Sequence, residues 1–225
     1  MVNGDAVGSR GGNVGVASVD DERLWVLRAQ QGDQEAFANL VEAYQRPVYS
    51  LAYRMLGNPS DAEDAAQEVF VRAFTHMESY DATRKFSSWI LSIASHYCID
   101  RLRRGHGRQV SLDDMEPDRW LPDTAPAPES EAMDRDREEQ IRRLLALLPE
   151  QHRLVIILRY WHDLSYEEIA QVTSTTESAV KSRLHRAREA MAEALAADRE
   201  AAALPRAEDQ VLAERNRSHA LYRAI

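Results

Sequence analysis

Five polar side chains near the C-terminus have the types and the spacing to bind DNA. They lie at positions i, i+3, i+4, i+7 and i+8, and are Ser178, Lys181, Ser182, His185 and Arg186. On a helix they share one face, opposite an apolar face of Val180, Leu184, Ala187 and Met191. Lysine and arginine bind guanine edges or phosphates, and serine and histidine hydrogen-bond to bases or backbone. An ordinary amphipathic surface helix would show the same pattern.

The segment before these residues favours DNA binding. Ser165 and Glu168 have the spacing of a capping box, which would begin a short helix ending near Val172. Thr176 can cap the next helix, expected over about residues 177–194. A short helix, a turn and a helix with a basic face make a helix-turn-helix, whose second helix enters the major groove.

Aromatic and basic side chains alternate in a second segment, expected to be helical over residues 86–104. The candidates are Phe86, Trp89, His96, Arg101, Arg103 and Arg104. Aromatic rings stack on unpaired bases and arginines pair with phosphates, so the segment suits single-stranded nucleic acid. Alternatively the aromatic residues belong to a core, and the i+4 stripe that contains Trp89 favours this for its indole.

A third group is acidic and polar. It lies in the first two turns of a helix predicted to begin at a capping box formed by Ser60 and Glu63 and to end near His76. Its members are Asp61, Asp64, Gln67 and Glu68. Acids at a helix N-terminus complement the helix dipole, which explains them without any further function. The functional hypothesis is an acidic face that docks a basic partner protein.

The sequence shows no nucleophile and base arrangement, no phosphate-binding glycine loop and no metal-ligand spacing. We therefore expect no enzyme activity, no cofactor and no metal site. The single cysteine excludes an internal disulfide. No apolar run is long enough to cross a membrane, and residues 1–18 do not resemble a secretory signal. These features predict a soluble, cytoplasmic protein.

Hydrophobic spacing predicts an all-α chain of two helical domains joined by a flexible acidic linker. The expected parts are a disordered arm at 1–19, a helical domain at 20–104, the linker at 105–140, a helix-turn-helix domain at 141–195 and a C-terminal extension at 196–225. Pro47 is expected to interrupt the helical pattern of the first domain. The formal net charge of the 225 residues is −9, and the linker alone, with 11 acids and 4 bases, contributes −7.

Three stretches together resemble the extracytoplasmic-function (group IV) class of bacterial sigma factors. Residues 61–74 are similar to the helix that binds core RNA polymerase, residues 86–104 to the segment that binds the −10 element, and residues 148–189 to the domain that binds the −35 element. The resemblance covers roughly residues 20–195 and implies a factor that binds core polymerase and promoter DNA. An anti-sigma factor is a further expected partner.

The resemblance implies a role for each group of candidates. The acidic group would contact polymerase, the aromatic and basic group the −10 element, and the group that begins at Ser178 the −35 element. The sequence departs from the class at His96, where asparagine is usual, and at Ser174 and Thr175, where glycine and an aliphatic residue are usual. A residue without the freedom of glycine at a positive φ costs on the order of 1 kcal/mol, so this turn is expected to be looser or differently shaped.

Two other functions fit parts of the sequence. A free-standing helix-turn-helix regulator explains the last domain but not the acidic helix or the aromatic and basic segment. A helical adaptor would bind no DNA at all. The acidic linker is either a solvated tether or, as the architecture of the class implies, a segment that crosses the polymerase surface and mimics RNA.

Overall fold

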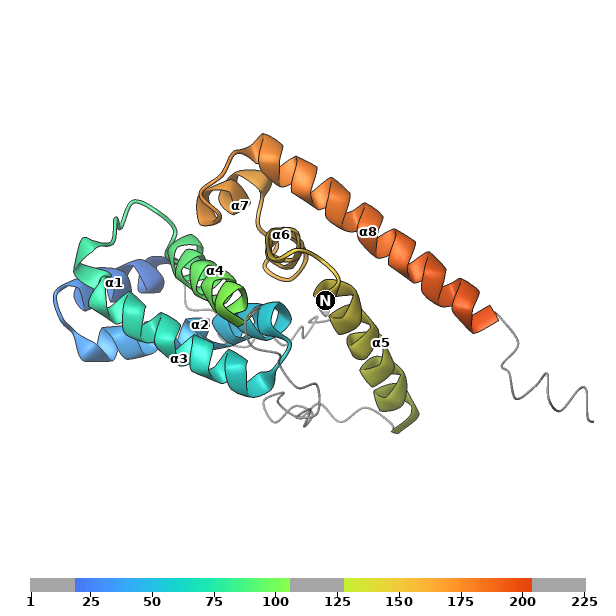
Figure 1. The fold of residues 1–225 in the computed structure, drawn as a ribbon. Coiled ribbons are helices and arrows are strands. Elements are labelled where there is room, and N and C mark those ends of the chain that lie inside the picture. Colours follow the sequence, from blue (N-terminus) through green and yellow to red (C-terminus); the bar gives the residue numbers. More distant parts are fainter. Residues whose placement is uncertain (1–18, 106–127, 204–225) are drawn as a thin grey trace, which may run out of the picture. The chain divides into compact units, whose positions relative to one another are not determined.

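The computed structural model describes residues 19–105 and 128–203, and these ranges contain helices and no strand (Figure 1). The all-α prediction is confirmed for them. The helices are α1 (Val19–Gln30), α2 (Gln34–Leu56), α3 (Pro59–Thr75), α4 (Phe86–Gly105), α5 (Pro128–Ala146), α6 (Glu150–Tyr160), α7 (Tyr166–Val172) and α8 (Glu177–Ala203), with a 3₁₀ turn, η1, at Met77–Ser79. None of these helices combines the length and the apolar character that crossing a bilayer needs. The chain divides into two compact units near residue 118.

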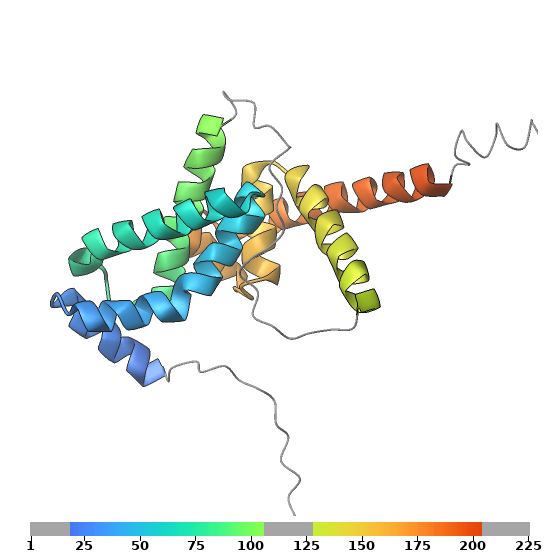
Figure 2. The same cartoon turned by 90° about the horizontal axis from the view of Figure 1, so that it is seen from below.

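Helix α2 is the centre of the first unit and packs against α1, α3 and α4. Helix α3 runs back along α2, as both views show (Figures 1 and 2). Leu40, Leu51 and Met55 of α2 are fully buried, as are Val69 of α3 and Ile90 of α4. Each large apolar side chain buried in this way contributes about 1.5 to 3 kcal/mol. These contacts hold α3 and α4, which carry two of the candidate groups.

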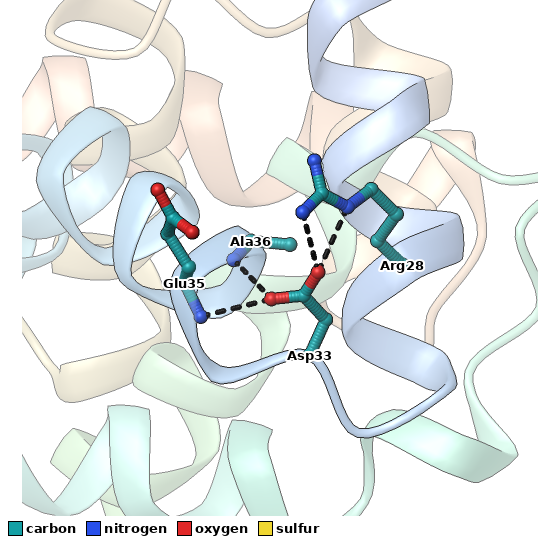
Figure 3. Close-up of polar contacts among 4 residues, drawn as sticks. All are labelled: Arg28, Asp33, Glu35 and Ala36. Carbon is teal, nitrogen blue, oxygen red and sulfur yellow. Dashed lines mark hydrogen bonds and ion pairs between the residues drawn. The ribbon is translucent and has the colours of Figure 1, made fainter.

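The turn between α1 and α2 is fixed by one carboxylate. Asp33 is the N-cap of α2, and its Oδ1 accepts hydrogen bonds from the backbone N–H groups of Glu35 and Ala36 at 3.0 and 3.1 Å (Figure 3). Arg28 of α1 pairs with the other carboxylate oxygen at 2.6 Å. Gly32 just before it has φ +86°, a conformation that glycine adopts without strain. The cap and the ion pair both hold the pKa of Asp33 below its usual value.

Two local predictions in this unit are wrong. Pro47 does not interrupt α2, which continues through it. The turns on either side bury Leu40, Val48 and Leu51, and this burial offsets the hydrogen bond that proline cannot donate. Ser60 is not the cap of α3, because Asn58 accepts the N–H of Asp61 at 3.1 Å and Pro59 occupies the first turn. Proline is favoured at that position, so the helix begins one residue before Ser60.

Helix α4 contributes its own stripe to the core. Its buried residues include Phe86, Ile90, Ala94 and Cys98. Burial raises the pKa of the Cys98 thiol to about 12. The predicted stripe of Trp89, Ile93, Tyr97 and Arg101 lies beside the buried one and is partly exposed.

In the second unit, helix α6 packs against α8. Its apolar run Leu154–Leu158 is helical and is buried at all five positions. Arg153 ties α6 to the end of α5 by donating to the carbonyls of Ala146 and Leu148 at 3.1 and 3.2 Å. Ala146 is the last residue of α5, where carbonyls lack partners within the helix, so the guanidinium acts as a cap for this helix end.

The predicted linker is too long, because residues 128–140 belong to α5. They carry six acids and two bases, so more than half of the −7 assigned to the linker lies in this helix. The Glu139–Arg142 ion pair, at 2.7 Å, shows how oppositely charged side chains one turn apart support such a helix. Helix α8 also continues to Ala203, beyond the predicted end of its domain. The arm at 1–18, residues 106–127 and residues 204–225 lie outside the described residues.

Candidate nucleic-acid interface

The helix-turn-helix begins as the sequence predicted. The backbone N–H of Ser165 donates to Glu168 Oε2 at 2.9 Å, and the N–H of Glu168 donates to Ser165 Oγ at 3.1 Å. This reciprocal pair is a capping box, and it begins α7. The cap of α8 is confirmed as well, since Thr176 Oγ1 accepts the N–H of Ala179 at 3.2 Å.

The turn between the two helices contains a strained residue. Ser174 has φ +50°, in the left-handed region that glycine adopts freely. The turn therefore keeps a left-handed residue at a position where the class usually has glycine, and serine bears the cost. The expectation of a looser or differently shaped turn stays a prediction.

Helix α8 presents all five candidates to solvent. Ser178, Lys181, Ser182, His185 and Arg186 are exposed. Val180, Leu184 and Ala187 on the opposite face are buried, whereas Met191 is only partly so. The structure thus separates a polar face from a packed one, as the spacing predicted.

Neighbouring side chains orient this polar face. Lys181 Nζ lies 3.5 Å from Glu177 and 5.7 Å from the centre of the Tyr166 ring, which presents its negative face to the ammonium. His185 Nε2 lies 3.3 Å from Glu189. The sequence did not indicate the role of Tyr166, because the residue lies on α7 and its contact with Lys181 depends on how the two helices are placed.

Positive charge also surrounds His152 of α6. Burial lowers the pKa of this imidazole, and the charges of Arg186 and Arg183 lower it further. Arg183 was not among the predicted site residues. Its charge, like that of Arg186, lies close enough to His152 to lower the pKa of the imidazole.

The candidates of α4 fall into two classes. His96, Arg103 and Arg104 are exposed. His96 Nδ1 lies 2.7 Å from the carbonyl oxygen of Ser92, so Nδ1 donates and the other ring nitrogen remains able to contact a ligand. These three residues are free of the core and can contact nucleic acid.

The aromatic candidates of α4 lie in a ring cluster. Phe86 is 2% exposed and packs edge-on against Tyr44 and Tyr80, with ring centres 5.2 and 5.7 Å away. It cannot stack on a base without leaving the core, so its assignment as a DNA contact is corrected to a core role. Trp89 is partly exposed, and its ring centre lies 4.6 Å from that of Tyr80. Part of the Trp89 side chain therefore remains accessible.

The acidic candidates of α3 are accessible, but three of them have partners. Asp64 and Gln67 are exposed, whereas Asp61 and Glu68 are partly buried. Glu68 accepts from Arg72 Nε at 2.7 Å. Asp61 forms an ion pair with Arg101 of α4, and Asp64 lies 3.8 Å from the same guanidinium. Asp61 and Arg101, predicted to serve different partners, thus contact each other.

Comparison with known proteins agrees with this architecture. The family model described as Sigma-70 region 2 matches residues 40–108, and the one described as Sigma-70, region 4 matches residues 138–191. The chain is 35% identical over 172 residues to the ECF RNA polymerase sigma factor SigW of Bacillus subtilis (strain 168), covering 74% of this chain and 92% of that protein. It is 33% identical to the ECF RNA polymerase sigma-E factor of Escherichia coli (strain K12) over 177 residues, 76% of this chain and 92% of that protein.

A solved structure shows the same arrangement of helices. CnrH, determined in complex with the cytosolic domain of CnrY, superimposes with a TM-score of 0.60 at 26% identity, covering 80% of this chain and 99% of that chain. The matches span both units, not the helix-turn-helix alone. The chain therefore belongs to the extracytoplasmic-function class of the sigma-70 family, and it is a sigma factor that directs promoter-specific transcription initiation.

Proposed function

We propose that α8 recognises the −35 element in duplex DNA, α4 binds the −10 element, and the acidic face of α3 docks on core RNA polymerase. The observation that carries this proposal is the division of α8 into a buried apolar face and an exposed polar one. A helix of this kind, preceded by a capped helix and a tight turn, fits the width of the major groove.

The exposed residues of α8 and of α4 suit different promoter elements. On α8, Lys181 and Arg186 supply donors for guanine edges or phosphates, and Ser178, Ser182 and His185 supply shorter-range hydrogen bonds. On α4, His96 and the accessible part of Trp89 are placed to contact an unpaired base, and Arg103 and Arg104 to pair with phosphates. The absence of the usual asparagine at His96 favours a different preferred base at one −10 position.

The docking face of α3 comprises Asp61, Asp64, Gln67 and Glu68. Carboxylates that are exposed or half-exposed can form ion pairs with a basic protein surface and can speed the encounter with it. We further propose that an anti-sigma factor binds the chain; CnrH, which has a similar fold, was determined in complex with the cytosolic domain of a second protein, CnrY. Binding to RNA polymerase places the protein in the cytoplasm.

The α8 assignment is tested by transcription from a −35-dependent promoter with purified core polymerase. We expect Arg186→Ala and Lys181→Ala to lower transcription by an amount that corresponds to about 1 to 3 kcal/mol for a base contact, with relaxed preference at one position. A phosphate contact would weaken all sequences alike. Arg199→Ala is the matched control, because this exposed arginine lies on α8 beyond the predicted polar face. Equal transcription by all three variants would refute the assignment.

The free-standing regulator is not favoured. It accounts for α7 and α8 but gives no role to α3, α4 and most of α2, which the match to Sigma-70 region 2 includes. The two functions also differ in DNA binding, because a regulator binds promoter duplex alone whereas a sigma factor requires core polymerase.

A further inference from the structure

Helices α3 and α4 are joined by a chain of polar contacts that runs along their packed surfaces. Arg101 Nη2 of α4 pairs with Asp61 of α3 and lies 3.8 Å from Asp64. The Tyr97 side chain also lies close enough to the Arg101 guanidinium to raise its pKa. The contacts therefore connect two of the four docking candidates to α4.

A second set of contacts continues from Tyr97. Its ring lies under the guanidinium of Arg72, 4.9 Å from the ring centre. Arg72 in turn holds Glu68 at 2.7 Å. Three of the four docking candidates are thus held by two arginines, with the Tyr97 ring between them. Only Gln67 has no part in this chain of contacts.

The Arg101 guanidinium is already engaged by a carboxylate of α3. The side chain of Arg101 is 36% exposed, and that of Asp61 is 33% exposed. Asp61 is the main cause that raises the pKa of Arg101, and the nearby Tyr97 side chain raises it further. A phosphate of the −10 strand would have to displace Asp61 from a charge-assisted hydrogen bond. Arg103, two residues further along α4, is exposed.

We propose that Arg101 is a positioning residue for polymerase binding rather than a contact with the −10 element. It fixes the carboxylates of Asp61 and Asp64 on the docking face and holds α3 against α4. This inference rests on the proposed docking face, and it adds the residue on the neighbouring helix that gives the face its geometry. It also reassigns Arg101 from the DNA to the polymerase side of the molecule.

The test measures two affinities for each full-length variant. The first is the affinity for core polymerase, measured by fluorescence anisotropy of the chain labelled at its N-terminus. The second is the affinity of the assembled holoenzyme for a fork-junction DNA with a single-stranded −10 element, at saturating core polymerase. Arg101→Gln should weaken core binding about three- to tenfold and leave DNA affinity unchanged. Arg103→Gln, the matched control, should do the reverse.

A double-mutant cycle separates positioning from general damage. Asp61→Asn should weaken core binding, and adding Arg101→Gln to it should weaken binding little further, because the two changes remove the same contact. Arg101→Lys keeps the charge and should restore part of the loss. Thermal unfolding of each variant shows whether the fold is intact. If Arg101→Gln and Arg101→Lys change the unfolding temperature equally and Arg101→Lys does not recover core binding, the positioning role is contradicted.

Two results overturn the inference in different ways. If Arg101→Gln leaves core affinity unchanged and weakens the fork-junction complex, Arg101 contacts DNA and the docking face stands. If Asp61→Asn and Asp64→Asn both leave core affinity unchanged, the docking face itself is misplaced and the inference falls with it. Weaker core binding by Arg101→Gln, non-additive with Asp61→Asn, supports it.

Discussion

The turn of the helix-turn-helix offers a prediction whose size can be worked from one dihedral angle. Ser174 has φ +50° and an exposed side chain, so replacing it with glycine removes strain without removing a packed group. A left-handed conformation costs an L-residue about 1 to 2 kcal/mol. Glycine loses more conformational freedom on folding than serine does, which reduces the gain in stability by about 0.4 to 1 kcal/mol. The difference lies between about 0 and 1.6 kcal/mol, so Ser174→Gly should stabilise the helix-turn-helix by about 0.8 kcal/mol.

Hydrogen exchange measured by mass spectrometry on peptides within residues 150–190 of the full chain would detect this change. Amides that exchange only when the unit opens should slow about two- to fivefold in Ser174→Gly. Thr175→Gly is the control one residue along, where φ is not positive and the side chain is partly buried. Exchange should be faster in this variant, because glycine at this position only increases the conformational freedom of the unfolded chain and removes packing contacts. Faster exchange in both variants would refute the left-handed turn.

Three further predictions follow from the first unit. Asp64→Lys combined with Glu68→Lys should abolish binding to core polymerase in a pull-down while leaving the circular dichroism spectrum unchanged, and Glu42→Lys on α2 should leave binding intact. His96→Asn should shift the preferred base at one position of a −10 promoter library, and identical preferences would show that His96 contacts no base. The pKa of Asp33 is lower in the folded chain than in the unfolded chain. The ionised carboxylate therefore stabilises the first unit at any pH above the pKa of the unfolded chain, and this stabilisation is lost as the pH falls through the pKa of the folded chain. Asp33→Asn keeps the capping oxygen and should flatten this part of the stability profile in acid, whereas an unchanged profile would show that the ion pair with Arg28 does not contribute.

Short-range signals in the sequence predicted the helix-turn-helix well. The capping box of Ser165 and Glu168 and the cap at Thr176 are set by residues three positions apart, so spacing alone identifies them. The two faces of α8 follow from helical periodicity for the same reason. The departure at Ser174 was visible too, because the residue type conflicts with the backbone conformation that the turn requires.

Other features depended on competing local signals. Asn58, Pro59 and Ser60 all suit a helix start, and the sequence alone favoured the wrong one. The first turns of α5 are too charged to show an apolar face, so the sequence pattern predicts a linker there rather than a helix. Pro47 breaks an isolated helix, and only the burial around it explains why α2 continues.

Contacts between distant residues lay beyond any local pattern. The pairing of Arg101 with Asp61 joins residues 40 positions apart, and it changes what both can do. Phe86 and Trp89 are three residues apart with similar side chains, yet one is buried and the other partly exposed. Which aromatic faces solvent is decided by the packing of Tyr44 and Tyr80, which belong to other segments.

The central claim is that this chain gives core RNA polymerase its promoter specificity. The most direct measurement is transcription in vitro with the purified chain and core polymerase on genomic DNA fragments, with start sites mapped at base resolution. We predict discrete start sites that share spaced −10 and −35 elements, present only when both components are added, together with no binding of the chain alone to those promoters in a gel shift. Tight binding of the chain alone to duplex DNA, with no new start sites in the presence of core polymerase, would contradict the account.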